Sequence, residues 1–204
     1  NVTMNNSGAG LTLSAPLNIS GVLTLTNGKI TTGANVLSLT ATGTTSGGNS
    51  NSYVNGNFLK TMASGGTTSM AYEVGDATYA PILVTFGSSI SSGSVTVAAK
   101  ARPHPEISSS RINTGNFVNR YWNITNAGVA APSVDIALSY NSGDMTGTPN
   151  TDYVTRMYDG TVWATTPGTT NTTSASAPLL ANASTGTGIA GGSFSGDYIA
   201  GQLY

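Results

Sequence analysis

The chain has 204 residues, a formal net charge of −1 and only 7% charged residues, against ~25% in a typical soluble protein. Because no run of either sign occurs, the sequence excludes the concentrated basic field by which proteins bind nucleic acids or anionic membrane surfaces. It has no cysteine for disulfides or thiolate metal sites, and no apolar run approaches the ~18 residues of a membrane-spanning helix, so we expect no membrane insertion.

The composition favours an all-β fold. Hydrophobic residues make up 38% of the chain and are regularly spaced, which argues against disorder. Gly, Ser, Thr and Asn fill most polar positions and suit pleated surfaces and tight turns. We predict an antiparallel β-sandwich preceded by a short β-solenoid-like or meander segment. Few charges with these polar residues are also typical of exported bacterial surface proteins, so we expect an extracellular, cell-surface location.

Residues 1–45 contain four short apolar-alternating segments separated by glycine-containing turns. The first three begin six residues apart, which predicts small rungs or a meander whose leucines share one face. Asn27-Gly28 is the best hairpin-turn signal among them. We expect the segment to pack on the next domain or on a neighbouring molecule, with Leu11 and Leu13 on a candidate assembly strand. The four segments are residues 11–13, 17–19, 23–25 and 37–39.

A polar, low-complexity stretch follows, and residues 46–52 are predicted to be a linker between two domains. Residues 53–204 are predicted to form the β-sandwich, because strand patterns recur there at roughly ten-residue spacing with turn signals between them. The expected strands cover residues 53–62, 69–74, 81–86, 94–100, 117–125, 133–140, 153–158, 162–164 and 194–200.

The strand expected over residues 117–125 alternates with period two, as a half-buried strand does. Val118, Arg120 and Trp122 lie on the face predicted to point inward. A buried guanidinium needs an acceptor or an aromatic plane. We therefore expect Arg120 to form a structural ion pair with Glu73 or Asp135.

Several segments resemble a β-rich module of very large secreted surface proteins of the Bacteroidota, many of them exported by the type IX system. The resemblance covers most of residues 20–140 and departs at Glu73, where the module usually has an aromatic residue and a proline before the valine. It implies an extracellular, non-enzymatic module of adhesin-like or scaffold proteins, with no catalytic residues to carry over. The segments are Tyr53-Val54-Asn55-Gly56, Tyr72-Glu73-Val74-Gly75-Asp76, Gly93-Ser94-Val95-Thr96-Val97, His104-Pro105 and Val118-Asn119-Arg120-Tyr121-Trp122.

Two sets of residues carry weak catalytic signals. His104 is the only histidine, and its Pro-His-Pro setting fits a rigid surface connection better than a triad, because no G-x-S-x-G motif is present. Glu73 and Asp76 are three residues apart and would point to opposite faces of a strand unless Gly75 bends it. We expect no enzymatic activity and no cofactor.

Two binding hypotheses stay open. Asp144, Asn150 and Asp152 offer the oxygen ligands that Ca²⁺ prefers, although their spacing does not fit an EF-hand and turns use the same residue types. Trp163 and Tyr153 would be a platform for a glycan if exposed, but aromatic residues in a sandwich usually belong to the core.

The function expected is structural. The chain would be a non-enzymatic subunit or module of a bacterial surface filament or adhesin, assembling through β-strand contacts with other copies of itself or neighbouring modules. The alternative is a carbohydrate-binding module of a secreted protein.

Overall fold

The computed structural model describes residues 1–65, 69–87, 90–148, 153–169 and 194–204, with side chains up to residue 164 in the fourth segment. The predicted all-β class is confirmed, since the helical elements of the described residues are two single 3-10 turns, η1 (Ile107–Ser109) and η2 (Ser142–Asp144). The strands are β1 (Val2–Asn5), β2 (Leu11–Thr12), β3 (Leu17–Ile19), β4 (Val22–Asn27), β5 (Ile30–Leu39), β6 (Thr44–Gly47), β7 (Val54–Met62), β8 (Ser69–Tyr72), β9 (Val74–Gly75), β10 (Ile82–Phe86), β11 (Gly93–Lys100), β12 (Ile112–Val118), β13 (Tyr121–Ala127), β14 (Val134–Leu138), β15 (Met145–Thr146), β16 (Tyr153–Tyr158), β17 (Trp163–Thr169) and β18 (Gly196–Leu203).

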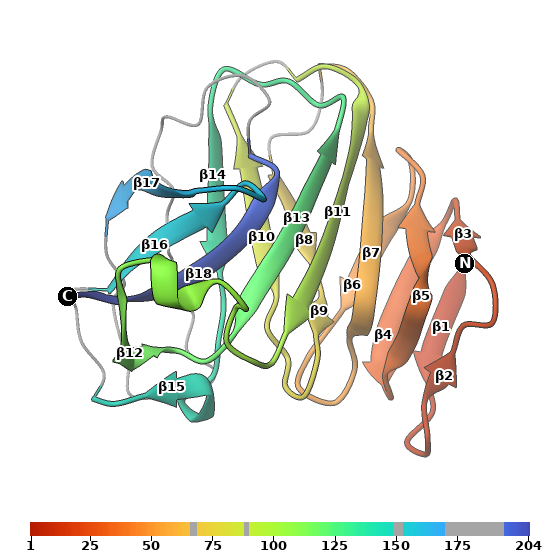
Figure 1. Ribbon diagram of the computed structural model, residues 1–204. Coiled ribbons are helices and arrows are strands. Elements are labelled where there is room, and N and C mark those ends of the chain that lie inside the picture. Colours follow the sequence, from red (N-terminus) through yellow and green to blue (C-terminus); the bar gives the residue numbers. More distant parts are fainter. Residues whose placement is uncertain (66–68, 88–89, 149–152, 170–193) are drawn as a thin grey trace.

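The N-terminal third is a short solenoid of three rungs. On one side β1, β4 and β6 pair in parallel, and on the other β2 and β3 pair with β5, which pairs with β7. The leucines of the third and fourth predicted segments fill the space between the two sides, since Leu23, Leu25, Leu37 and Leu39 are at most 1% exposed, whereas Leu11 of the first is 40% exposed. The solenoid-like N-terminal segment is therefore confirmed, and it occupies one end of the molecule (Figure 1).

Asn27-Gly28 forms a solenoid corner and not a hairpin turn. It joins β4 to β5, which belong to different sheets. Gly28 has φ +88°, and an added Cβ would collide with the carbonyl oxygen of Asn6 in the rung before. The turn chemistry was thus recognised, but stacked rungs leave no space for the two flanking strands to pair with each other.

The predicted linker over residues 46–52 is wrong. Residues up to Gly47 belong to β6, the third rung, and Ser52 is buried and donates its hydroxyl to the carbonyl oxygen of Gly28 at 2.9 Å. The side chains of β6 are mostly exposed, so its sequence carries no apolar alternation. Backbone pairing with β4 holds it in the sheet, and composition gives no sign of that.

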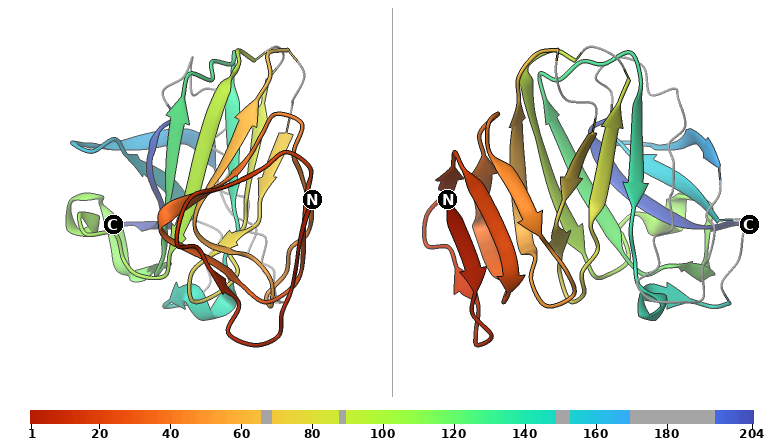
Figure 2. Two further views of the ribbon diagram at one scale, coloured as in Figure 1. Left: turned by 90° about the vertical axis from the view of Figure 1, so that its right-hand side faces the viewer. Right: turned by 180° about the vertical axis from the view of Figure 1, so that it is seen from behind.

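β7 joins the solenoid to the sandwich. It pairs in parallel with β5 on one side and antiparallel with β11 on the other. The expected boundary between residues 1–45 and 53–204 is therefore not present as a break, because one sheet runs through both parts (Figure 1). Beyond β7 this long sheet continues through β11, β13 and β18, and a three-stranded antiparallel sheet of β8, β10 and β14 packs behind it (Figure 2).

The strand expected over residues 117–125 is two strands. β12 ends at Val118 and β13 begins at Tyr121, and the Arg120 amide donates to the carbonyl oxygen of Val118 at 2.7 Å, which closes a tight turn between them. The predicted inward face is nevertheless correct, because Val118, Arg120, Trp122 and Ile124 are all buried.

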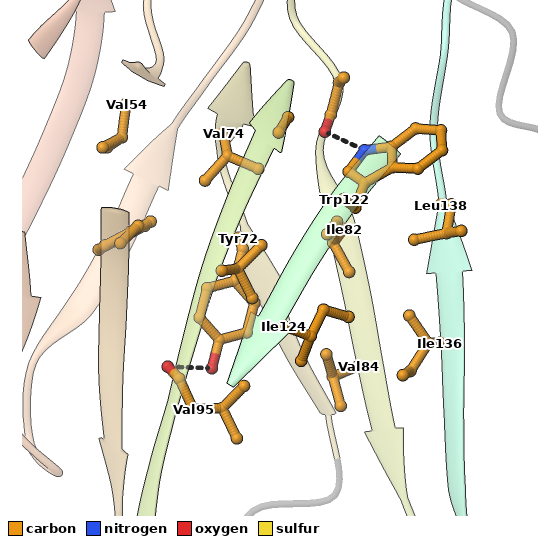
Figure 3. Close-up of a cluster of buried hydrophobic side chains, with 14 of the residues drawn as sticks. Val54, Tyr72, Val74, Ile82, Val84, Val95, Trp122, Ile124, Ile136 and Leu138 are labelled. Carbon is orange, nitrogen blue, oxygen red and sulfur yellow. Dashed lines mark hydrogen bonds between the residues drawn. The ribbon is translucent and has the colours of Figure 1, made fainter. Parts of the chain in front are cut away.

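A large hydrophobic core fills the space between the layers, and a smaller cluster of Ile112, Phe117, Tyr121 and Ile199 lies beside it. Trp122 is fully buried and donates its indole N–H to the carbonyl oxygen of Ala80, and the buried Tyr72 donates to that of Val95 at 3.2 Å (Figure 3). Trp122 and Tyr72 thus keep their polar atoms hydrogen-bonded, as burial requires. Among the described residues, no helix is long and apolar enough to span a membrane.

Candidate functional site

Arg120 forms a buried ion pair, but its partner is neither of the residues expected. The guanidinium is fully buried, and its Nη2 lies 2.9 Å from Oδ1 of Asp144 and also donates to the hydroxyl of Thr78. Its Nε donates to the other carboxylate oxygen of Asp144 at 3.3 Å. The prediction of an ion-paired structural arginine is therefore correct in kind and wrong in its partner.

Asp144 is committed to this pair and to its own turn. Its carboxylate accepts the backbone N–H of Asn141 at 2.9 Å, which completes a capping box around η2, and the hydroxyl of Thr78 at 3.2 Å. The open hypothesis of a Ca²⁺ site at Asp144 is thereby weakened, because the arginine already neutralises the charge of the carboxylate. Asn150 and Asp152 lie outside the described residues.

Glu73 lies at a seam between the two three-stranded sheets, β1-β4-β6 and β8-β10-β14, and Arg120 pairs with Asp144 instead. It accepts the hydroxyl proton of Tyr79 and interacts electrostatically with Lys60. Lys60 is only 6% exposed, and its Nζ donates to the hydroxyl of Thr45 on β6 at 2.8 Å and to the carbonyl oxygen of Ala71 on β8 at 2.5 Å. One ammonium group therefore joins two sheets that do not pair with each other.

Burial lowers the pKa of Lys60 to about 8, against the smaller opposing effect of the Glu73 carboxylate. Burial, with a hydrogen bond to Glu73, also raises the pKa of Tyr79. A cavity of about 300 Å³ opens beside the ammonium group and is lined by residues 41, 43–45, 60, 69–71 and 73.

Asp76 and Asp135, the other candidate carboxylates, have contacts outside the seam of Lys60 and Glu73. Asp76 accepts the backbone N–H of Ala101 at 3.0 Å, so it and Glu73 belong to different hydrogen-bond sets. Asp135 lies on β14 opposite Thr85 of β10. Glu73 and Asp76 therefore use different hydrogen-bond partners, each engaged in a structural contact.

His104 is the centre of an aromatic cluster and is 4% exposed. Its ring packs edge-on against Tyr121, Tyr158 and Trp163, with centroid distances of 4.9 to 5.1 Å. The backbone N–H of Glu106 donates to Nδ1 at 3.0 Å, so the ring proton is on Nε2, which donates to Asp197 at 2.9 Å. Both nitrogens are engaged, which fits the rigid connection expected from Pro-His-Pro.

The expected glycan platform is not formed. Tyr153 is fully buried and donates its hydroxyl to Asn116 at 2.8 Å. Trp163 is half-buried, its ring packs on His104 and Tyr158, and its indole N–H donates to the carbonyl oxygen of Glu106 at 3.0 Å. Trp163 thus helps to close the aromatic cluster and does not present a flat, free ring.

Leu11 and Leu13 belong to the first rung of their own chain. Their backbone N–H groups donate to the carbonyl oxygens of Lys29 and Thr31, each at 2.9 Å. The Leu13 carbonyl oxygen also accepts the side-chain amide of Asn35. The candidate assembly strand is therefore occupied in cis, and what it leaves open is its outer edge.

The outer edge of the first rung is unpaired in the described part of the chain. β2 and β3 each pair only with β5, and β1 pairs only with β4. Because Leu11 and Leu13 turn their N–H groups toward β5, the peptide groups of Thr12 between them face outward. The carbonyl oxygen of Ile19 on β3 accepts the backbone N–H of Thr40, so the N–H and C=O groups of the preceding Asn18 face outward as well.

The open edge also lacks charged side chains. The first charged side chain of the sequence is Lys29, so the whole first rung and β4 carry none. Leu11 is 40% exposed at this edge. Natural edge strands are usually protected by charges, proline or bulges. Here the protection is one irregularity in β1 and Pro16 between β2 and β3.

Three functional features were missed at the sequence level. From the sequence, Asp144 is only an open Ca²⁺ hypothesis, Lys60 is not considered, and Asp197 is not predicted to be the partner of His104. Lys60 alternates in step with the buried Phe58 and Met62 on β7, so period-two analysis of that strand could have found it. Asp144 and Asp197 meet their partners through contacts that span 24 and 93 residues, and no local signal marks them.

Comparison of this chain with protein-family models, with curated proteins and with solved structures finds no match.

Proposed function

We propose that this chain is a structural, non-enzymatic module of an extracellular bacterial surface filament or adhesin, and that it assembles through β-strand contacts at the open edge of its first rung. The observation that carries the proposal is an unpaired edge of parallel strands whose residues have no charge to oppose association. Such an edge is a template for another strand. For the purified chain, the occupant we propose is a strand of a second copy.

The placement of the termini supports a modular role. The N-terminus lies at the solenoid end, beside β1 and β3, and the C-terminus lies at the opposite end (Figure 1). Modules with termini at opposite ends extend when they are linked in a row. The open rung would then face a neighbour along the row, which is where a filament needs its contact.

Removing the first rung would not test this proposal. Deletion of residues 1–14 takes away β1 and β2 and leaves β4 and part of β5 as a new unpaired edge. A truncated chain that still associates would therefore say nothing about the native edge. The test has to block outward-facing backbone groups and leave the rung in place.

Thr12→Pro does this, with Thr12→Ala as its matched control. Proline at Thr12 removes an N–H that points away from β5, so no hydrogen bond within the chain is lost. Alanine removes the same side chain and keeps the N–H. Light scattering across a concentration series and negative-stain electron microscopy should show oligomers or fibres for the wild type and Thr12→Ala, and monomers for Thr12→Pro. Equal assembly of the two variants would rule out this edge.

A further inference from the structure

A pocket lies on the outer face of the long sheet, near the aromatic cluster around His104. It has a volume of about 240 Å³, and its lining includes Asn123, Thr125, Tyr158, Asp159, Gly196 and Asp197. Three adjacent strands form its floor, because Asn123 of β13 pairs with Asp197 of β18, and Asp197 pairs with Tyr158 of β16. The pocket thus holds an amide, a carboxylate and an aromatic ring side by side.

The polar groups of the pocket floor are held in place before any ligand arrives. The Asp197 carboxylate accepts the side-chain amide of Asn123 at 2.6 Å through one oxygen and the ring N–H of His104 at 2.9 Å through the other. Each carboxylate oxygen can accept about two hydrogen bonds, so each retains one. In the described part of the chain, Asn123 keeps its carbonyl oxygen and one amide hydrogen without a partner.

The aromatic wall is fixed in the same way. The Tyr158 ring packs against His104 at 5.1 Å and against Trp163 at 5.1 Å between ring centroids. His104 is itself locked by Glu106 and Asp197. A ligand that stacks on Tyr158 would therefore meet a ring whose orientation is already set, and this lowers the entropic cost of binding.

The charges of the pocket disfavour an anionic ligand. Asp159 at the rim accepts three hydrogen bonds from Thr161 and Val162, and those from Val162 and then Thr161 hold its pKa below the ordinary value. Two carboxylates without a lysine or arginine in the lining disfavour an anion. The described residues contain no group of three or more His, Cys, Asp or Glu side chains able to hold a metal ion. The remaining acceptor sites of Asp197 and the remaining amide hydrogen of Asn123 match a neutral ligand whose hydroxyl groups both donate and accept.

We propose that this pocket binds a single neutral sugar ring. A hydroxyl group can donate to Asp197 while it accepts from the Asn123 amide, and neighbouring hydroxyls of a pyranose are spaced for such a pair. The C–H face of the ring would stack on Tyr158. The pocket is smaller than the ~300 Å³ at which drug-sized sites begin, which suits one sugar residue and no more. This site replaces the platform expected at Trp163 and Tyr153.

The test uses saturation-transfer NMR with the methyl glycosides of glucose, galactose, mannose and N-acetylglucosamine. Thr125 is exposed and lines the pocket, so Thr125→Trp should fill it. Thr96 lies directly opposite Thr125 on β11, outside the pocket lining, so Thr96→Trp is the matched control. We expect at least one glycoside to bind the wild type and Thr96→Trp, and its affinity to fall at least tenfold in Thr125→Trp.

Titration of the wild type with the same glycosides, followed by NMR chemical shifts, gives a second readout that needs no variant. Binding should shift the side-chain amide resonances of Asn123 and the backbone amides of Gly196 and Asp197. The proposal fails if none of the four glycosides binds at tens of millimolar, or if the shifts centre elsewhere. Because the pocket lies away from the open rung, its failure would leave the assembly proposal untouched.

Discussion

Arg120 and Asp144 form a buried ion pair that ties the turn between β12 and β13 to η2. The guanidinium is fully buried and the carboxylate is 9% exposed, so water solvates neither charge well. Removing one partner of such a pair leaves an uncompensated buried charge. Each partner is therefore required while the other is present, whatever the net contribution of the pair to the free energy of unfolding.

Arg120→Met should lower the free energy of unfolding by about 3–5 kcal/mol, because Asp144 would be left charged in the interior. Arg120→Ala should cost more, since it also leaves a cavity. The double variant Arg120→Met with Asp144→Leu should recover part of the loss. Urea unfolding of the single and double variants measures the coupling, and strictly additive losses would show that the two side chains are not paired.

Lys60 makes stability depend on pH in an unusual direction. Its pKa is lowered from 10.5 in the unfolded chain to about 8 in the fold, so between these values the unfolded state binds more protons. Stability contributed by this group is therefore smallest below pH 8 and rises toward pH 10.5, by roughly 3 kcal/mol at most.

Urea unfolding at pH 7, 8 and 9 measures this effect below the range in which tyrosines titrate. The wild type should gain stability across the series, and Lys60→Met should remove the gain. Lys29→Met is the control, since Lys29 lies over the Tyr53 ring and its ammonium is not buried in the seam. A flat wild-type profile would mean that Lys60 is solvated at the seam.

Buried tyrosines should destabilise the fold at higher pH. Burial raises the pKa of Tyr72, Tyr140 and Tyr198 above the ordinary value near 10. Above pH 10 the unfolded chain therefore loses protons that the native state keeps, and stability falls as pH rises. Thermal unfolding from pH 10 to 11.5, followed with tyrosinate absorbance, should show both changes together. Tyr204→Phe should alter neither, because Tyr204 is 84% exposed.

Gly56 is required by the contact between two rungs. It has φ +125°, and an added Cβ would collide with the hydroxyl oxygen of Thr32, which is fully buried and accepts the N–H of Asn57 at 2.9 Å. Gly56→Ala should lower the melting temperature strongly, with a loss of more than about 2 kcal/mol. Gly33→Ala is the control, because Gly33 has φ +58° and nothing within 4 Å, so only about 1–2 kcal/mol of backbone strain is expected. Equal losses would show that the contact with Thr32 is unimportant.

Patterns with a local physical cause were predictable from the sequence. Period-two alternation placed Arg120 and Trp122 inside, and the spacing of short leucine segments indicated stacked rungs. The same reasoning failed where pairing and not side-chain burial decides the structure. β6 has exposed polar side chains and is a strand only because β4 lies beside it.

The candidate site was less predictable than the fold. A buried Arg120 requires an acceptor, which the sequence indicates. That the acceptor is Asp144 depends on η2, which places Asp144 against the turn between β12 and β13. The sequence leaves open whether Trp163 is exposed as a glycan platform, and in the structure its ring packs on His104. Long-range contacts of this kind have no signature in a single sequence.

The most direct test of the assembly edge is amide hydrogen exchange at Thr12, measured residue by residue in dilute and in assembled protein. In dilute monomer the Thr12 amide should exchange fast, while those of Leu11 and Leu13, which donate to Lys29 and Thr31, should be protected. On assembly, Thr12 should become protected and its two neighbours should change little. If the protein assembles while Thr12 still exchanges freely, the open first rung is not where the copies meet.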